Sequence, residues 1–462
     1  MKRIFISSMA LLIVMLVCIS SFAFSAGAAT EKGFTYEISD KGAVITAYSG
    51  TAAAVVIPDK LGGKTVVGIA DGVFMHMKEL TSFTVPDTVT SIGRDAFYGT
   101  KFYNDAANWT NGNQLYIGDI LVDVDYKARG DIKIKEGTRV IADFAVAFSK
   151  SIKIVSVPDS VKYIGEGAFS ECNKLTAINV STANKNYASQ SGVLFDKSIS
   201  TLVCYPSAKT GSTYEIPSTV KTIESFAFKG NDELVKITVP KTVKNIGSFS
   251  FAYCTALKSA NLPEGLTVVS EGMFQNCSGL NAVVLPETTV EIGKNAFEWC
   301  SKLENITLPS NVKTIGDNAF YYCRGLKGIF LPKSITAIGN SAFYGCKSLK
   351  TVNFSGTQAQ FKAIDVDMHN LPFSATQVNY NSKGLVQVGS MLALSSGDTA
   401  IIGDVNSDVV VSIKDATMIQ KHLAEIEMLS GDNQLCADTN SDKDITIQDA
   451  TYIQKKLAMI NY

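Results

Sequence analysis

Two segments near the C-terminus carry oxygen-bearing side chains at a spacing that can bind a cation. The first places them at Asp404, Asn406, Asp408 and Asp415, and the second at Asp438, Asn440, Asp442 and Asp449. Each set falls at positions 1, 3, 5 and 12 of a loop, the spacing with which an EF-hand loop wraps calcium. Carboxylate and amide oxygens are hard ligands that suit a hard cation. The sequence therefore predicts two calcium sites, related by an internal duplication with an offset of 34 residues.

Each predicted loop leads into an amphipathic helix that begins at the last ligand. The two helices start with the same sequence motif, Asp-Ala-Thr-x-Ile-Gln-Lys, at Asp415 and at Asp449. The sixth loop position normally takes glycine for a sharp turn, but here it holds Val409 and Lys443. A β-branched residue at positive φ is strained. We therefore expect the first loop to bind calcium more weakly or to bend differently.

These two halves resemble a type I dockerin, the small all-α calcium-binding module that docks secreted proteins onto cohesin modules of a scaffoldin. The resemblance covers residues 401–462 and includes aspartate, rather than glutamate, as the last ligand. It implies that Val410 and Asp444 supply main-chain carbonyls to the two calcium ions. It also implies cohesin contacts at Ile413, Lys414, Gln420, Lys421, Ile447, Gln448, Gln454 and Lys455.

Most of the remaining chain follows a period of 23 residues. The period is kept by Pro217, Pro240, Pro263, Pro286, Pro309 and Pro332, by Phe228, Phe251, Phe274, Phe297, Phe320 and Phe343, and by Cys254, Cys277, Cys300, Cys323 and Cys346. Self-similarity at this length predicts a solenoid of stacked repeats, because one unit alone cannot bury its apolar face.

Each repeat predicts the same succession of elements. The stretch Leu-x-x-Ile-x-Leu, as at Leu326, Ile329 and Leu331, predicts a strand with an inward apolar side. Proline then ends the strand, since it cannot donate to a ladder. An Ile-Gly pair predicts a second extended piece that ends in a turn. The Ala-Phe-x-x-Cys segment predicts one helical turn, with Phe and Cys near the axis.

Residues 52–380 resemble the BspA-like leucine-rich repeats, which occur in surface proteins of oral and gut bacteria and some protists. The matching unit is Pro-x-x-Val-x-x-Ile-Gly-x-x-Ala-Phe-x-x-Cys-x-x-Leu. The expected domain organisation is a signal peptide at 1–28, an N-terminal cap at 29–51, the repeats at 52–380, a linker at 381–400 and the dockerin at 401–462. Within the repeats we expect hairpin insertions at 101–139 and 181–213, and a C-terminal cap at 351–380.

The nine cysteines invite two interpretations. Equivalent side chains of a solenoid run parallel, roughly 5 Å apart, whereas a disulfide needs approaching Cβ vectors. No Cys-x-x-Cys pair provides the usual zinc spacing. We therefore favour buried free thiols that fill the core. Cys204 and Cys436 lie outside the repeat position and have no obvious partners.

The outward strand position of the repeats is expected to carry any binding function of the array. It holds Thr84, Ser156, Asn179, Thr238, Asn261, Val284, Thr307, Phe330 and Asn353. A sugar platform would contain more aromatic rings, and an anion site more Arg or Lys. A broad protein contact, a plain spacer and a merely solvated sheet remain open. Trp109 is the single residue that suggests a glycan contact, although a packed tryptophan is the simpler interpretation.

The composition limits the cellular role. The 42 basic and 43 acidic residues leave a net charge of −1, which does not favour a nucleic-acid partner. A basic start at Lys2 and Arg3, an apolar run and small residues at 26–28 predict a cleaved export signal. No later segment is apolar enough for a transmembrane anchor. We therefore expect a secreted protein, extracellular or held at a cell surface through cohesin.

The predicted function is that of a non-catalytic component of a cellulosome-like complex, with the repeats as a protein-binding or glycan-binding surface. A cell-surface adhesin is the alternative. A polysaccharide-degrading enzyme is less well supported, by association with dockerins only. The three histidines, His76, His369 and His422, have no evident catalytic partners, and no catalytic residue is predicted.

Overall fold

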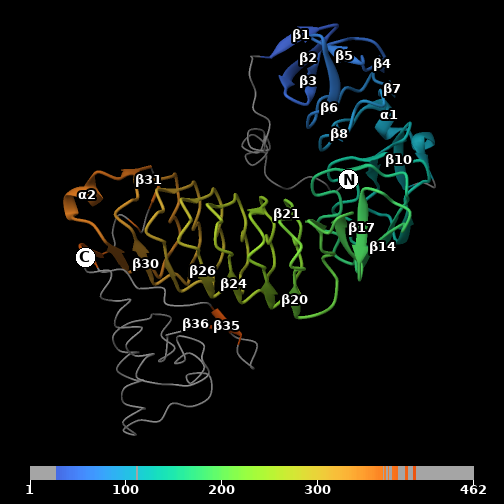
Figure 1. Ribbon diagram of the computed structural model, residues 1–462. Coiled ribbons are helices and arrows are strands. Elements are labelled where there is room, and N and C mark those ends of the chain that lie inside the picture. The colour runs from blue at the N-terminus through green and yellow to red at the C-terminus, as the bar shows by residue number, and fades with distance from the viewer. Residues whose placement is uncertain are drawn as a thin grey trace. The chain divides into compact units, whose positions relative to one another are not determined.

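The computed structural model describes residues 28–110, 113–367, 369–370, 373 and 377–382, together with the backbone of 391–393 and 399–401. The chain divides into two units (Figure 1). The first contains the described residues up to Asp125 and the segments Lys135–Ala145 and Ser160–Ala168. The second contains Tyr126–Ile134, Val146–Asp159 and the described residues from Phe169 onward.

The first unit begins with an antiparallel meander that passes into parallel pairing. Strands β1, β2 and β3 pair antiparallel, and β3, β6 and β8 then pair in parallel. Strand β5 pairs antiparallel with β6, and β4 pairs in parallel with β7. Their bounds are β1 (Ala29–Glu31), β2 (Phe34–Ser39), β3 (Gly42–Tyr48), β4 (Ala54–Val56), β5 (Lys60–Leu61), β6 (Lys64–Ile69), β7 (Ser82–Thr84) and β8 (Ser91–Ile92).

A hairpin interrupts the coils of the first unit. Strands β9, β10 and β11 pair antiparallel, and β11 continues in parallel to β13 and β15. A short α-helix and a 3-10 turn precede the hairpin. The bounds are α1 (Lys101–Asn104), η2 (Ala106–Asn108), β9 (Trp109–Thr110), β10 (Gln114–Ile117), β11 (Ile120–Val124), β13 (Val140–Ile141) and β15 (Tyr163–Ile164).

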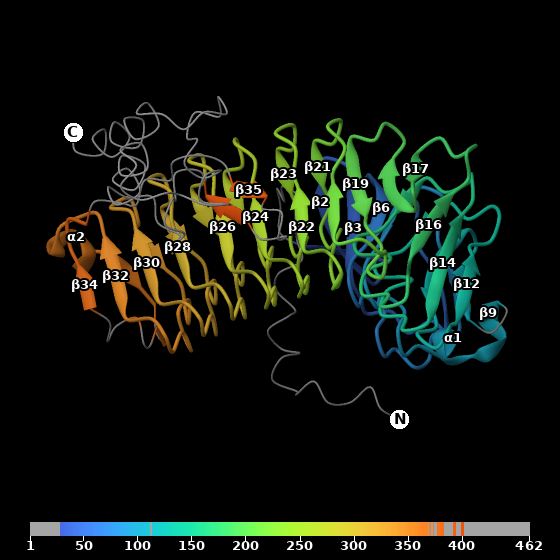
Figure 2. The same cartoon turned by 90° about the horizontal axis from the view of Figure 1, so that it is seen from below.

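The second unit stacks its coils so that equivalent strands pair in parallel (Figure 2). Its longer strands form the series β12-β14-β16, β20-β22-β24-β26 and β28-β30-β32-β34. Their bounds are β12 (Gly130–Lys133), β14 (Ile152–Val157), β16 (Ala177–Val180), β20 (Thr213–Glu215), β22 (Lys236–Thr238), β24 (Ser259–Asn261), β26 (Ala282–Val284), β28 (Asn305–Thr307), β30 (Gly328–Leu331), β32 (Thr351–Phe354) and β34 (Gln377–Asn379).

The opposite side of the second unit carries the two-residue strands of the Ile-Gly segments. They follow the antiparallel strands β17, β18 and β19, and pair as β19-β21-β23 and β25-β27-β29-β31-β33. The bounds are β17 (Tyr187–Gln190), β18 (Val193–Asp196), β19 (Thr201–Cys204), β21 (Thr222–Ile223), β23 (Asn245–Ile246), β25 (Val268–Val269), β27 (Glu291–Ile292), β29 (Thr314–Ile315), β31 (Ala337–Ile338) and β33 (Asp365–Val366).

The last described elements follow the final coil. Helix α2 (Gln358–Lys362) starts at Thr357, whose side chain forms a capping box with Gln360. Phe361 of this helix packs on Phe354 at 5.3 Å between ring centroids. Beyond it, the backbones of β35 (Met391–Ala393) and β36 (Thr399–Ile401) pair antiparallel.

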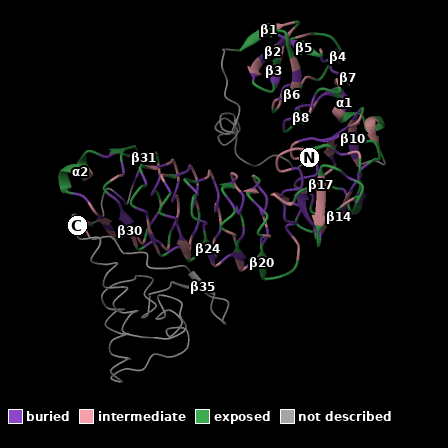
Figure 3. Ribbon diagram, in the orientation of Figure 1, coloured by how far each residue is buried: buried purple, intermediate pink, exposed green. Residues whose placement is uncertain are grey.

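A continuous apolar core runs inside the coils of the second unit (Figure 3). The phenylalanine of each repeat is fully buried and stacks on its equivalents in the neighbouring coils. Centroid distances along the column from Phe228 to Phe343 lie between 5.1 and 5.5 Å, with interplanar angles of 5° to 24°. The prediction of a solenoid with short strands is confirmed.

The Ala-Phe-x-x-Cys segment is not a helical turn, so that expectation was wrong. Asn318 and Tyr322, on either side of Phe320, have positive φ values of 54° and 55°. The Phe320 amide donates to the Ala342 carbonyl of the next coil, and the Tyr322 amide to Tyr344. An α-helix would direct these N–H groups back along its own chain. The segment is instead a chain of turns whose alternate amides bond to the next coil.

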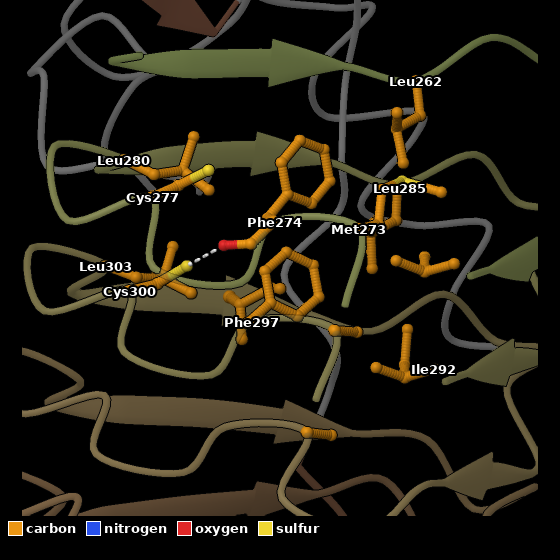
Figure 4. Packing of buried hydrophobic residues seen from close by; sticks show 14 of the residues in the cluster. Leu262, Met273, Phe274, Cys277, Leu280, Leu285, Ile292, Phe297, Cys300 and Leu303 are labelled. Carbon is orange, nitrogen blue, oxygen red and sulfur yellow. Dashed lines mark hydrogen bonds between the residues drawn. The ribbon is translucent and has the colours of Figure 1, made fainter. Parts of the chain in front are cut away.

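The cysteines of the described chain are free and buried, as expected for core thiols. Their position is more specific than that of an apolar filler, because each of the five thiols from Cys254 to Cys346 donates to the carbonyl of a phenylalanine 26 residues earlier (Figure 4). In the figure the Cys300 Sγ donates to the Phe274 oxygen at 3.1 Å. Cys254, Cys277, Cys323 and Cys346 repeat this bond at 3.0 to 3.3 Å. Asn231, at the same repeat position, donates its side-chain amide to the neighbouring carbonyls of Pro206 and Ser207.

Within the described residues, no helix is both long enough and apolar enough to cross a membrane.

Candidate functional site: an aromatic patch on the turns of the array

The predicted calcium ligands and cohesin contacts, from Asp404 to Lys455, lie outside the described residues. Among the described residues, no group of three or more His, Cys, Asp or Glu side chains could hold a metal ion. Among the described residues, the surface of the repeat array is therefore the candidate for ligand binding.

The outward strand row presents a polar surface with little apolar area. Thr84, Asn179, Thr238 and Asn261 are exposed, and Ser156, Thr307 and Asn353 are half-buried. The two apolar members, Val284 and Phe330, are only 9% and 8% exposed, although the alternation predicts that they face outward. This row consequently offers neither aromatic nor charged anchors for a ligand.

Trp109 is a packed residue, in agreement with the simpler interpretation. Its indole N–H donates to the Tyr103 carbonyl at 2.8 Å. Its ring meets the Tyr103 ring edge-on, with centroids 5.3 Å apart. Its ring and its N–H are both engaged by Tyr103, which supports the interpretation of a packed tryptophan.

Each coil contains a second-turn position, two residues after the ladder phenylalanine or its equivalent, at which φ is positive. The position is held by His76, Gly99, Phe148, Glu171, Gly230, Tyr253, Asn276, Trp299, Tyr322 and Gly345. Only glycine adopts such angles without steric cost, and asparagine is the common alternative. Gly230, Asn276 and Gly345 adopt this backbone conformation easily, so the coil does not require a large ring at this position.

Rings stand at this position in several coils (His76, Phe148, Tyr253, Trp299 and Tyr322), but Trp299 and Tyr322 belong to adjacent coils. The Trp299 and Tyr322 rings stack with centroids 4.5 Å apart and an interplanar angle of 12°. Their φ values are 60° and 55°. Gly345 follows in the next coil, where an added Cβ would come within 3.0 Å of the Tyr322 ring. The two rings therefore lie between a coil with Asn276 and a coil with Gly345 at the same position.

Two further tyrosines extend this cluster along the array. Tyr321 and Tyr344 stack with centroids 5.4 Å apart, and Tyr321 also lies 4.6 Å from Tyr322. Trp299 and Tyr344 are 37% and 40% exposed, among the most exposed large apolar side chains of the described chain. We call these four aromatic residues, together with Arg324, the aromatic patch.

Arg324 lies beside the rings of Trp299 and Tyr322. Its guanidinium carbon is 5.3 Å from the Trp299 ring centroid and 5.1 Å from that of Tyr322. Among the described residues, no carboxylate forms an ion pair with it. The Arg324 side chain is exposed, and its planar N–H fork matches a carboxylate in two-bond geometry.

A polar pair borders the patch on the same turns. Gln275 Nε2 donates to Glu298 Oε2 at 2.5 Å. Burial is the main cause that raises the pKa of Glu298, and hydrogen bonds from Gln275 and Trp299 oppose it. Burial is also the main cause that raises the pKa of Tyr321. The border can therefore both donate and accept hydrogen bonds.

A second cation on the array is different, because its charge is satisfied internally. Lys229 Nζ lies 2.7 Å from Glu171 and within 5.1 to 5.7 Å of the rings of Phe226, Phe249 and Tyr253. Its side chain is only 13% exposed. This cage stabilises the coils and leaves no cation for a ligand.

The sequence interpretation missed the aromatic patch because it examined the strands and treated the two variable positions of Ala-Phe-x-x-Cys as unimportant. A signal was present in the repeats themselves. The variable pair reads Gln-Asn at 275–276, but Glu-Trp at 298–299 and Tyr-Tyr at 321–322. Aligning the coils would have shown large rings where neighbouring coils carry small or polar residues.

Comparisons with known proteins agree with both parts of the chain. The sequence matches the BspA type leucine-rich repeat region in six copies, over residues 57–108, 127–210, 197–297 and 278–382, which is more than half of the chain. Residues 402–458 match the dockerin type I domain. No protein in the curated collection matches.

Solved structures similar to this chain are bacterial repeat proteins. One is a leucine-rich repeat protein from Eubacterium ventriosum, 28% identical, with a TM-score of 0.45, covering 69% of this chain and 95% of that one. Another is a leucine-rich cell surface protein from Faecalibacterium prausnitzii, 26% identical, with a TM-score of 0.42, covering 74% of this chain and 98% of that one.

Proposed function

The chain belongs to the BspA-type leucine-rich repeat family and ends in a dockerin type I domain, and on this premise we propose that it is a non-catalytic, secreted component of a cellulosome-like complex. Dockerin type I domains bind calcium and dock onto cohesins. The single observation that carries the proposal is the presence of this docking module on an array whose matched regions are interaction repeats. The dockerin attaches the chain to a scaffoldin, and the array presents a binding surface.

Calcium holds the docking module in its binding shape. In the first loop the ligands are Asp404, Asn406, Asp408 and Asp415, with the Val410 carbonyl, and in the second they are Asp438, Asn440, Asp442 and Asp449, with the Asp444 carbonyl. Binding to the folded form stabilises it by mass action. The second loop binds calcium more tightly than the first, because the β-branched Val409 strains the turn of the first loop.

Cohesin recognition uses equivalent residues on the two duplicated halves. Ile413, Lys414, Gln420 and Lys421 form the first set, and Ile447, Gln448, Gln454 and Lys455 the second. The duplication gives the module two similar faces. Either face can therefore meet a cohesin, so that substitutions in both sets are needed to remove binding.

The test is a titration of the full chain against purified type I cohesins, with calcium present and after chelation. We expect calcium-dependent binding that is lost when the first and last ligands of both loops are changed (Asp404→Asn/Asp415→Asn/Asp438→Asn/Asp449→Asn) and unchanged in the control Glu425→Gln, an acidic residue outside the ligand positions. Equal cohesin affinity before and after chelation would refute the docking role. Retention on cells that lack scaffoldin would instead identify a free adhesin.

The absence of catalysis has its own test. Within the described chain, the side chains at the candidate surface are aromatic rings, one guanidinium and a Glu–Gln pair, which is not an acid–base constellation. The purified chain should release no reducing ends from plant polysaccharides. Steady release that follows the protein through purification would overturn this part of the proposal.

A further inference from the structure

The aromatic patch has the properties of a ligand site more than of a folding element. The second-turn position accepts glycine and asparagine in neighbouring coils at positive φ. Placing an L-residue with a large side chain in this region costs roughly 1–2 kcal/mol. Residues held in such conformations concentrate at functional sites. His76, Phe148 and Tyr253 share this φ, so the backbone alone does not single out Trp299 and Tyr322; the adjacency and stacking of their two rings do.

Trp299 has one ring face that no other ring covers. Among the described residues, its only ring neighbours are Tyr321 and Tyr322. The preceding coil holds Asn276 at the second-turn position. Its main-chain N–H donates to the main-chain carbonyl of Glu298, the residue before Trp299. With its indole 37% exposed, Trp299 can receive an apolar ring face of a ligand.

Arg324 adds a charge requirement to this platform. Its guanidinium is held against two rings and has no carboxylate partner among the described residues. Lys347 occupies the equivalent position one coil later and is also exposed. The planar fork of an arginine is pre-organised, so it loses less conformational freedom for each hydrogen bond that it forms with a carboxylate. The ligand that fits therefore combines flat apolar faces with carboxylate groups.

The extent of the patch favours a linear ligand over a protein surface. A whole aromatic side chain offers ~150–250 Å², so four partly exposed rings offer roughly 300 Å². A standard protein interface needs about 800 Å² on each partner and a dry centre. The patch instead follows three consecutive coils and is bordered by tyrosine hydroxyls and the Glu298–Gln275 pair.

We propose that the aromatic patch binds an acidic polysaccharide, with pyranose rings on Trp299 and the tyrosines and a uronate carboxylate on Arg324. The inference rests on the proposed function, since a component of a polysaccharide-degrading assembly meets such chains. A pyranose ring presents axial C–H groups to an aromatic face and its hydroxyls to the polar border. The carboxylate accepts two N–H bonds from the guanidinium.

The experiment is calorimetric titration of the full chain in calcium buffer with three probes: a short galacturonate oligomer, its methyl ester and a neutral xylan oligomer. We expect binding of the free acid, and loss of roughly tenfold to a hundredfold for the ester and for Arg324→Gln, since a hydrogen bond to a charged group is removed. Trp299→Ala should weaken binding of the acid similarly. The control Tyr163→Ala removes an isolated ring that is 42% exposed and should change nothing.

Unaltered thermal denaturation of each variant shows that the coils are intact. No binding of the free acid, equal binding of the neutral oligomer, or unchanged affinity in Arg324→Gln would overturn the proposal, and recognition of purified proteins alone would do so as well. Cohesin binding is measured on the same samples. If the aromatic patch does not bind the free acid, the measured cohesin affinity still tests the docking role. If the chain does not bind cohesin, galacturonate binding still tests the patch.

Discussion

Replacing Phe297 tests whether the stacked phenylalanines hold the coils together. Phe297 is fully buried, and its ring stacks on Phe274 at 5.5 Å and on Phe320 at 5.3 Å. Truncation of a buried phenylalanine to alanine costs about 3–5 kcal/mol in general. Two aromatic pairs contribute about 0.5–1.5 kcal/mol each beyond their area. We therefore expect Phe297→Ala to lose about 4 kcal/mol, and Phe297→Leu about 1–3 kcal/mol, since leucine keeps most of the volume but neither pair.

The assay is urea denaturation of the full chain followed by circular dichroism, with Tyr344→Ala as the exposed aromatic control. Each coil contacts its neighbours, so the loss should spread to the amides on both sides. Hydrogen exchange should accelerate at the amides of Phe274 and Phe297, which donate to the following coil. A loss below 1 kcal/mol in Phe297→Ala, or exchange confined to residue 297, would refute the idea of a cooperative column.

Three further predictions follow from burial and backbone geometry. The seven buried thiols of the described residues should resist Ellman's reagent until the chain unfolds, because burial raises the pKa of Cys254, for example, to about 12. Rapid reaction of these seven thiols in native buffer, in a variant with Cys436→Ser, would contradict this. Burial likewise raises the pKa of Asp143 to about 7, so its contribution to stability is complete below about pH 4 and is lost as the pH rises through 7, by roughly 1 kcal/mol per unit. Asp143→Asn, whose side-chain oxygen can still accept from the Glu166 amide, should flatten urea midpoints over that range, and an unchanged slope would reject the assignment. Trp299→Asn should change the free energy of unfolding by less than about 1 kcal/mol, because relief of positive φ offsets the lost stack; a loss above 2 kcal/mol would make the ring a folding element.

The sequence predicted the parts of the fold that repeat. Proline, phenylalanine and cysteine recur in register, and each position has one physical role in every coil, so that periodicity alone places Phe297 and Cys300 in the core. The same periodicity could not reveal the turn conformation. Ala-Phe-x-x-Cys is compatible with a helical turn until one knows that the amides of Phe320 and Tyr322 bond to the next coil.

The cysteine position shows a different limit of the sequence. Burial of the thiols was predictable from the register, since parallel side chains cannot form disulfides. Their hydrogen bonds were not, because the acceptor of Cys300 is the carbonyl of Phe274, and only the coil geometry brings the two together. Asn231 in the same position also donates to carbonyls of the preceding coil, so the position can hold a donor as well as an apolar group.

The candidate surface was unpredictable for a related reason. Outward alternation marks Phe330 as an exposed ring, yet it is 8% exposed, whereas Trp299 stands in a turn that carries no alternation. Residues at such positions can be compared between the coils of one array, because the backbone has the same conformation at that position in each coil. His76, Phe148 and Tyr253 also carry rings at positive φ, so the backbone does not distinguish Trp299; the stacking of its ring on that of Tyr322 in the next coil does. The place where two stacked rings, exposed apolar surface and a guanidinium without an ion pair among the described residues coincide is therefore the most informative part of the array for function.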